Sequence, residues 1–382
     1  MVKVAVIGLG KMGISHLSMV RALPGVEVVG IVDATTYLLG VLKKYTGLAT
    51  YTSIDKLLAA EKPDAAIVAT PSRLHYPMVK QLLEAGVAVF CEKPFTLSGA
   101  EGEELVELAA AKHLVTQVGY HNRFVGAFGE VKRLLDAGAI GTVSHGLAEA
   151  YGPVVLKPQG GTWRSKSTEG GGCLYDYAAH PLNLINWYLG EPIGVGGTVL
   201  NSIFSAEIDD EVSSTLYYDQ DRTVSVSVNW SDESVRKMTT RITLWGTGGR
   251  IFADRQEIQV YLREDTTIPD GYQPGWNVRY TTELTEPVEF YLRGEEYTAQ
   301  LAHFVERVRT GAVDGENTFA SAVVTDKLIE RMIDDSKRGP SVRLTDAVAA
   351  KEPVAASSLP ARLLGAARSG IKRIRTLVSG GK

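Results

Sequence analysis

Lys93 is the first residue whose type and neighbourhood suggest chemistry. It lies in Phe90-Cys91-Glu92-Lys93-Pro94, at the end of an apolar run, Val87–Cys91, that predicts a buried strand. Ligands bind outside the carboxyl ends of the strands in open α/β sheets, so Lys93 is expected at a ligand-binding edge. An ammonium group there can hydrogen-bond a substrate hydroxyl or take part in proton transfer. A surface lysine beside a turn proline is the alternative.

An aspartate and a histidine four positions apart form the second candidate. They follow Gly170-Gly171-Gly172. If a helix begins near Leu174, Asp176 and His180 share a face with Cβ atoms about 6 Å apart, and the carboxylate can orient the imidazole. Pro181 disfavours helical geometry at the residue before it, so the shared face requires a kink. A histidine suits a base that takes the proton of a secondary alcohol. A core histidine in a capped helix is the alternative.

Positive charge gathers in a third stretch, Trp163-Arg164, with Lys157 and Lys166 nearby. Such charge can hold a carboxylate or phosphate of a substrate, although a solvated loop fits the same residues. Weaker candidates, which either line a cleft or only pack, are His75, after Thr70-Pro71-Ser72, and Asn122-Arg123-Phe124.

A glycine-rich turn near the N-terminus indicates what binds beside these residues. Val2–Ile7 predicts a strand, Gly8-Leu9-Gly10-Lys11-Met12-Gly13 a turn, and Ile14–Leu23 a helix. The first glycine allows the tight turn, the second lets the backbone approach a pyrophosphate, and the third lets the helix pack on the strand. The helix N-terminus then receives the phosphates. The pattern predicts a dinucleotide site, with a purely structural turn as the alternative.

Asp33 selects between two dinucleotides. It ends a second apolar run, Val26–Val32, twenty positions after Gly13. An acid at this place accepts hydrogen bonds from a ribose 2′-hydroxyl and repels a 2′-phosphate. NAD is therefore the expected cofactor, and NADP is disfavoured.

The remaining pattern divides the chain into three parts. Apolar strands alternate with helical segments up to about Tyr120, which is typical of a doubly wound parallel sheet. Later runs, among them Val143–Tyr151 and Thr223–Asn229, alternate or are β-branched, and two helices are expected over Glu295–Arg309 and Phe319–Lys337. We predict an α/β protein with a dinucleotide-binding domain over 1–121, a substrate-binding and oligomerisation domain with a mostly antiparallel open sheet over 122–345, and a tail over 346–382.

Composition excludes several classes of function. The net charge of −4 gives no excess of positive charge to attract nucleic acid. No apolar run is long enough to cross a bilayer, and the chain enters a strand at once instead of a signal peptide, which predicts a cytoplasmic protein. Cys91 and Cys173 are expected to be free, buried thiols. The seven histidines show no zinc-type spacing, so no metal site is predicted.

Together, and in this order, these stretches resemble the glucose–fructose oxidoreductase / inositol 2-dehydrogenase family, also called Gfo/Idh/MocA. The resemblance runs from about Val2 to Leu344. The matching motifs are Gly8-Leu9-Gly10-Lys11-Met12-Gly13, Ala69-Thr70-Pro71 with His75, Glu92-Lys93-Pro94, Trp163-Arg164, and Gly170-Gly171-Gly172 leading to Asp176 and His180.

The resemblance implies an N-terminal Rossmann domain and a second domain whose open sheet buries one face and often pairs subunits through the other, hence a homodimer or homotetramer. It implies oxidation or reduction of a sugar, polyol or nucleotide sugar at one carbon. Lys93, Asp176 and His180 would be the catalytic group, with His180 as proton acceptor, Lys93 polarising the reacting oxygen or relaying its proton, and Asp176 binding substrate or orienting the others. The roles of Lys93 and His180 stay open.

The same resemblance implies two sets of binding residues. The cofactor-binding set is Gly8, Gly10, Lys11, Met12, Gly13, Asp33, Thr70, Pro71, His75, Glu92 and Lys93. The substrate-binding set is Lys93, Arg123, Trp163, Arg164, Asp176, His180 and Asn183. Asn183 departs from the pattern, because many members have an aspartate three residues after the histidine. An amide can still hydrogen-bond a hydroxyl.

We therefore expect an NAD-dependent dehydrogenase that acts on a sugar or polyol. One alternative is a nucleotide-sugar dehydrogenase in cell-envelope glycan synthesis, with Lys157, Arg164 and Lys166 as phosphate contacts. The other is a non-catalytic NAD-binding regulatory protein, against which the retention of Lys93, Asp176 and His180 argues.

The tail after Ala347 has its own pattern. Past Glu352 it has no acidic residues, and basic side chains oppose an apolar helical face. This basic amphipathic pattern suggests peripheral contact with an anionic membrane or a partner. A disordered tail, favoured by Gly365 and Gly370, is the alternative.

Overall fold

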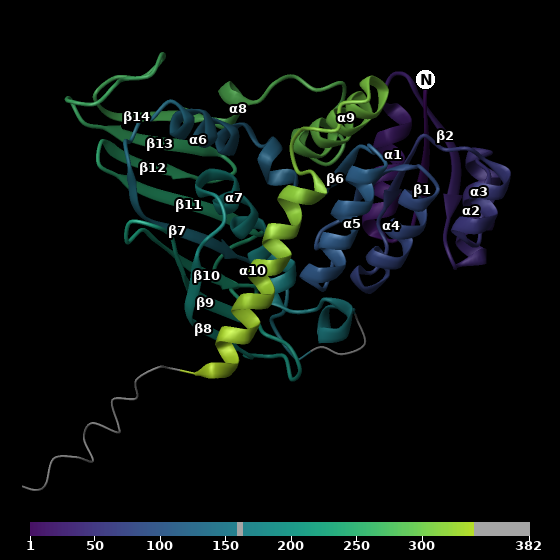
Figure 1. Ribbon diagram of the computed structural model, residues 1–382, viewed down its shortest axis with the longest axis horizontal. Helices are drawn as coiled ribbons and strands as arrows, with labels where there is room; N and C mark the ends of the chain where they lie inside the picture. The colour runs from purple at the N-terminus through teal and green to yellow at the C-terminus, as the bar shows by residue number, and fades with distance from the viewer. Residues whose placement is uncertain (159–162, 340–382) are drawn as a thin grey trace, which may run out of the picture. The chain divides into compact units, whose positions relative to one another are not determined.

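Short apolar strands form the first of two sheets in the computed structural model, which describes residues 1–158 and 163–339 (Figure 1). The predicted amphipathic tail lies outside the described residues. Six parallel strands run in the order β3-β2-β1-β4-β5-β6. They are β1 (Val2–Ile7), β2 (Val26–Val32), β3 (Thr50–Tyr51), β4 (Ala65–Val68), β5 (Ala88–Cys91) and β6 (Thr116–Val118). All residues of β4 and β5 are buried, as expected for a sheet covered on both faces. The predicted doubly wound parallel sheet is confirmed.

Helices connect these strands by crossovers. They are α1 (Lys11–Ala22), α2 (Thr36–Thr46), α3 (Ile54–Ala60), α4 (His75–Glu84) and α5 (Gly99–Ala111). Helix α1 begins three positions before the predicted start, so Gly13 lies inside its first turn. A side chain at Gly13 would place its Cβ 1.8 Å from the carbonyl oxygen of Gly8. This close contact between helix and turn is why the position needs glycine.

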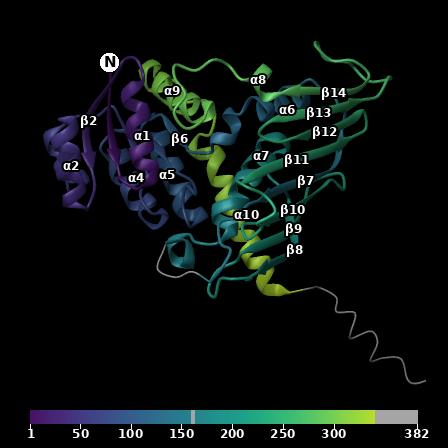
Figure 2. The ribbon, with the colours of Figure 1, turned by 180° about the vertical axis from the view of Figure 1, so that it is seen from behind.

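A later helix, α9 (Glu295–Thr310), completes the cover of the first sheet. It contacts α1 and β1, and Leu301 and Phe304 join the apolar cluster that holds Val4 and Phe90. Figures 1 and 2 both show α9 beside α1. The packing of the first sheet thus crosses residue 121, the boundary in the predicted division of the chain.

The second sheet has eight strands in the order β14-β13-β12-β11-β7-β10-β9-β8. Neighbours are antiparallel except β7 and β10, which confirms the predicted mostly antiparallel sheet. The strands are β7 (Val143–Tyr151), β8 (Gly194–Asn201), β9 (Glu211–Tyr217), β10 (Thr223–Asn229), β11 (Thr239–Gly246), β12 (Gly249–Ala253), β13 (Glu257–Leu262) and β14 (Gly275–Tyr280). In β10, buried valines alternate with exposed serines, so one face of the sheet is apolar and packed.

Helices cover that packed face. They are α6 (Gly126–Asp136), α7 (Ala179–Leu189) and α10 (Phe319–Arg338), and a short helix, α8 (Thr281–Leu284), follows β14. Helix α10 contacts β8 of the second sheet, β6 of the first sheet, and α5, one of the crossover helices of the first sheet. It runs between the two sheets in both views (Figures 1 and 2). The helix therefore ties the two sheets together. No helix among the described residues is long and apolar enough to span a bilayer.

The glycine contacts at the start of α1 can be tested through stability. Gly13→Ala is expected to lower the free energy of unfolding by about 2–4 kcal/mol, because its methyl group would overlap the carbonyl of Gly8. Gly10→Ala, in the same turn, would meet no atom within 4 Å and should cost about 1 kcal/mol or less. Urea unfolding of both variants measures the difference. Equal losses would show that the contact at Gly13 does not constrain the fold.

Candidate active site

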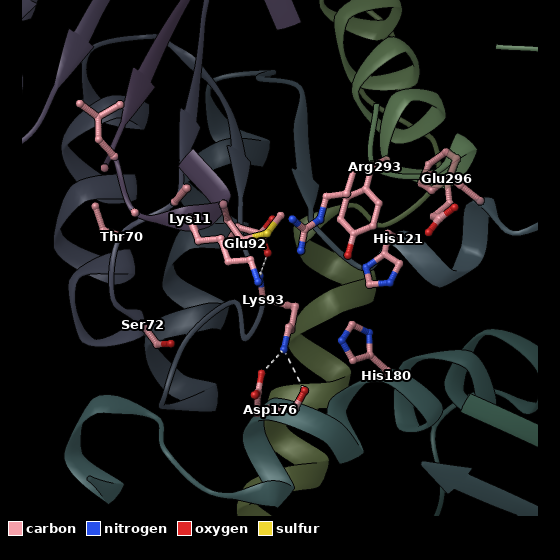
Figure 3. A pocket seen from close by; sticks show the side chains of 18 of the residues that line it. Lys11, Thr70, Ser72, Glu92, Lys93, His121, Asp176, His180, Arg293 and Glu296 are labelled. Atoms are coloured by element: carbon pink, nitrogen blue, oxygen red, sulfur yellow. Dashed lines mark hydrogen bonds and ion pairs between the residues drawn. The ribbon is translucent and has the colours of Figure 1, made fainter. Parts of the chain in front are cut away.

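A cleft of about 1820 Å³ opens at the carboxyl edge of the first sheet. Its walls come from the turn after β1, the ends of β2, β4 and β5, the turn before α7, and the start of α9 (Figure 3). The cleft therefore lies where ligands bind in open α/β sheets. Among the predicted residues that line it are Gly8, Gly10, Lys11, Met12, Asp33, Thr70, Pro71, Glu92, Lys93, Arg164, Asp176 and His180. Gly13 lies behind this wall, in contact with Gly8.

One end of the cleft fits a dinucleotide. Gly10 caps α1 without a side-chain hydrogen bond, and the space where its Cβ would lie is open to at least 4 Å. Asp33 is fixed by two backbone donors, since the N–H groups of Leu9 and Thr35 each lie 2.7 Å from one of its carboxylate oxygens. An open helix N-terminus suits a pyrophosphate, and a fixed carboxylate at the end of β2 suits a ribose diol.

Glu92 lies between that end and Lys93, and a buried histidine positions it. His16 on α1 lies with its Nε2 2.6 Å from Oε1 of Glu92, while Oε2 accepts the backbone N–H of Lys93 at 3.2 Å. Burial opposes ionisation of Glu92, but the hydrogen bond with His16 and the charge of Lys93 hold its pKa below the ordinary value. The motif Glu92-Lys93 thus presents a carboxylate and an ammonium group side by side in the cleft.

Lys93 is held by Asp176 from the second part of the chain. Its Nζ lies 2.7 Å from Oδ1 and 2.8 Å from the backbone oxygen of Asp176 (Figure 3). Leu174–Ala178 forms a π-helical turn that leads directly into α7. This irregular turn supplies the kink that the sequence required before Pro181. Within it, the backbone oxygen of Asp176 accepts a hydrogen bond from Lys93.

A second cation reaches the same carboxylate. Nε of Arg164 lies 3.1 Å from Oδ2 of Asp176. Burial alone would disfavour the charged form, yet the charges and hydrogen bonds of Lys93 and Arg164 hold the pKa of Asp176 below its ordinary value. Asp176 is therefore an ionised residue that orients two cations.

His180 lies beside this ion pair and is neutral. It is 3% exposed, and burial, followed by the charges of Lys93 and Arg255, lowers its pKa well below the ordinary histidine value. Its Nδ1 has no hydrogen-bond partner within the described part of the chain. The residue lines the cleft, and a neutral imidazole there can accept a proton from a ligand.

A second histidine, His121, faces His180. No sequence motif predicts a functional role for it, apart from its place after β6. The two ring centroids are 4.9 Å apart, and His121 stacks on Tyr297 at 4.5 Å. Arg255 donates to Nε2 of His121 at 3.3 Å and pairs with Glu296. Burial first, and then neighbouring positive charge such as that of Arg255, lower the pKa of His121 well below the ordinary value. His16 and Arg255 were likewise absent from the predicted site.

Several predicted site residues lie away from the cleft wall. The ring of His75 is buried behind it, with Nδ1 2.8 Å from the carbonyl of Pro94 and Nε2 3.0 Å from that of Thr70. Arg123 and Asn183 pair with each other at 2.9 Å, both buried outside the lining. These three residues hold the walls in place and do not present side chains to the cleft.

The basic stretch also differs from the expectation. Trp163 and Arg164 belong to a short 3-10 helix, Trp163–Ser165, and Arg164 joins the cleft through Asp176. Lys157 and Lys166, expected as phosphate contacts, are exposed and do not line it. The two cysteines are free and buried, as predicted.

Two family models match the chain. Residues 2–120 match the model described as the oxidoreductase family with an NAD-binding Rossmann fold, and residues 128–252 match the GFO/IDH/MocA C-terminal domain. The chain belongs to the Gfo/Idh/MocA family. It is therefore an NAD-binding oxidoreductase, which confirms the class that the glycine turn and the three catalytic candidates predicted.

Relatives with curated names point to polyols and sugars. The chain is 28% identical over 317 residues to scyllo-inositol 2-dehydrogenase (NAD(+)) of Bacillus subtilis, covering 81% of this chain and 87% of the relative. It is 29% identical to a putative UDP-kanosamine synthase oxidoreductase subunit of Amycolatopsis mediterranei, covering 79% and 87%.

Solved structures show the same fold. A levoglucosan dehydrogenase in complex with NADH and L-sorbose superposes with a TM-score of 0.78 at 20% identity, covering 88% of this chain and 97% of that chain. GenD2 from gentamicin A biosynthesis, in complex with NAD, superposes with a TM-score of 0.72 at 25% identity, covering 89% and 95%.

The electrostatic coupling in the site can be measured directly. Arg255→Gln is expected to raise the pKa of His180 and of His121, because it removes a positive charge that disfavours the imidazolium form. NMR titration of the histidine ring signals measures both values. Arg250→Gln is the matched control, since Arg250 stacks over Trp245 outside the cleft lining. An unchanged His180 titration in Arg255→Gln would contradict this account.

Proposed function

We propose that this protein is an NAD-dependent dehydrogenase that interconverts a secondary alcohol and a ketone of a sugar or polyol. The observation that carries the proposal is the arrangement of Lys93, Asp176 and neutral His180 in one cleft with the dinucleotide end. The names of the inositol and levoglucosan dehydrogenases support this substrate class.

The chain would hold the cofactor with the turn Gly8–Met12 and with Asp33, and Thr70, Pro71 and Glu92 line the same path. When bound, NAD supplies the hydride acceptor for alcohol oxidation. The protein must then orient the alcohol and remove its hydroxyl proton, because the carbon loses a hydride as the oxygen loses a proton.

Lys93 and His180 divide this work. The ammonium group of Lys93 has three N–H donors, and Asp176 accepts two of them through its side chain and backbone. The third is left for the reacting oxygen, whose developing negative charge the ammonium stabilises. His180 is neutral and takes the proton, since its environment disfavours only its charged form. Asp176, with Arg164, positions Lys93.

The reaction is tested by following the absorbance of reduced nicotinamide with NAD or NADP and a panel of polyols, free sugars and nucleotide sugars. Turnover with NAD is expected, and Lys93→Met and His180→Asn are each expected to lose at least about 100-fold in kcat. Lys132→Met, which removes a half-buried lysine on α6 outside the cleft lining, is the matched control and should keep full activity. Full activity of both site variants would exclude these roles.

One observation favours a second candidate, a nucleotide-sugar dehydrogenase. Arg236 and Lys237 line the cleft near Pro153 and Val154, and neither has a carboxylate within 4.0 Å among the described residues. Their loop is anchored, because the backbone N–H of Asp232 bonds the carbonyl of Gly152. Two such cations suit the diphosphate of an activated sugar. They replace Lys157 and Lys166 as the phosphate contacts in this hypothesis.

The charge of the substrate can be tested at these two positions. If the substrate is a nucleotide sugar, Arg236→Gln with Lys237→Gln should raise KM at least about ten-fold and leave kcat within about two-fold, because the contact is equal in ground and transition states. Lys157→Gln with Lys166→Gln removes the same charge outside the cleft and should leave KM unchanged. Equal KM values for both double variants would exclude an anionic contact here.

The family relationship and the open sheet also support a homo-oligomer. The face of the second sheet that the helices leave open carries exposed apolar side chains, including Tyr261, Trp276 and Val278. Such a patch fits an interface between subunits. The free thiols of Cys91 and Cys173 suit the cytoplasm, where we propose that the protein works.

A further inference from the structure

The contact between His16 and Glu92 is a buried pair that the proposed reaction does not use. His16 lies in the second turn of α1 and is 0% exposed, packed edge-on against Phe90. Its Nε2 lies 2.6 Å from the Glu92 carboxylate. Gly119 leaves room for this carboxylate, since a Cβ there would lie 3.0 Å from Oε2. Glu92 is thus held by a donor on one side and tight packing on the other.

The hydrogen bonds assign the proton on His16. Nδ1 of His16 is buried and has no partner among the described residues, so a proton there would be a buried donor without an acceptor. The geometry therefore favours the neutral ring with its proton on Nε2, donated to Glu92. In this form His16 stabilises the carboxylate and does not cancel its charge.

Other cations near Glu92 do not neutralise it by contact. Lys93 directs its ammonium group to Asp176 at 2.7 Å, away from the Glu92 carboxylate. Arg293 points into the cleft from the segment before α9 (Figure 3), but its side chain is exposed and has no carboxylate within 4.0 Å in the described chain. A fixed negative charge therefore remains on the cleft wall.

This charge lies where the nicotinamide must bind. The reacting carbon is next to the oxygen that Lys93 contacts, and the nicotinamide must touch that carbon to exchange a hydride. Glu92 directly precedes Lys93 and lines the same cleft, and it lies between Lys93 and Lys11 (Figure 3). The two redox forms of NAD differ in this ring, which is cationic when oxidised and neutral when reduced.

We propose that the carboxylate of Glu92, held ionised by His16, makes the site bind oxidised NAD in preference to reduced NAD. The inference rests on the proposed role of Lys93, which places the nicotinamide beside Glu92, and it does not depend on which sugar or polyol is oxidised. Glu92 acts on the charge of the bound ring, and His16 is a positioning residue that acts through Glu92. The consequence is a bound cofactor whose oxidised form is stabilised, which favours release of NADH after alcohol oxidation.

The test is the ratio of two dissociation constants, Kd for NADH over Kd for NAD⁺, measured by calorimetry without substrate. Glu92→Gln keeps the size of the side chain and removes the charge, so the ratio should fall about ten-fold. Asp33→Asn is the matched control. This substitution changes a contact to the adenosine half of the cofactor, which is identical in NAD⁺ and NADH. Both dissociation constants should therefore rise by the same factor, and their ratio should stay unchanged.

His16 variants separate positioning from packing. His16→Gln retains an N–H donor and should keep most of the wild-type ratio, whereas His16→Leu leaves the carboxylate without a donor and should lower it as Glu92→Gln does. Circular dichroism establishes whether each variant is folded. If His16→Leu does not fold, the ratio measured for Glu92→Gln alone decides the proposal. An unchanged ratio in Glu92→Gln, with both forms still bound, would overturn the proposal. Failure of the wild type to bind either form would overturn NAD binding as well.

Discussion

The ion pair between Lys93 and Asp176 is the constraint on which the site depends. Lys93 lies two residues after strand β5 of the first sheet, and Asp176 belongs to the turn that opens α7 under the second sheet. The pair is nearly buried, and a buried charge without its partner is costly. Neither sheet alone could satisfy both ions. The pair of Lys93 and Asp176 therefore forms only when the two sheets pack against each other.

An irregular turn before α7 supports this arrangement. A regular helix normally uses all its interior carbonyls, so none would be available to a lysine from another element. The chain at Leu174–Ala178 takes a π-helical turn instead, and the backbone oxygen of Asp176 in this turn accepts a hydrogen bond from Lys93. The turn thus gives the ammonium group of Lys93 a backbone acceptor beside the carboxylate.

The sequence predicted the features that depend on short spacing. The glycine turn, Asp33, Lys93 and the pair of Asp176 and His180 each stand in a local pattern whose chemistry can be read directly. The strand β14 was not among the predicted strands. Its apolar residues Trp276, Val278 and Tyr280 do alternate with polar ones, but they are exposed, so their period marks the open face of the sheet and not its packed core.

Residues whose role depends on distant partners escaped prediction. His16 meets Glu92 across 76 positions, and Arg255 meets His121 across 134. Nothing local marks either contact. The reverse also occurred, since Arg123 and Asn183 looked available in sequence and are engaged with each other in the fold. Sequence spacing shows which groups can react, while packing decides which of them face the cleft.

The docking of α9 on the first sheet has a consequence for synthesis on the ribosome. The nucleotide-binding strands are complete once residue 118 has been made, yet Phe304, which covers one of their faces, follows 186 positions later. At roughly 5–20 residues per second, that face stays uncovered for about 10–40 s. During this interval the growing chain exposes an apolar surface to chaperones and to neighbouring chains, so the late helix sets the period in which the nascent protein is most prone to aggregate.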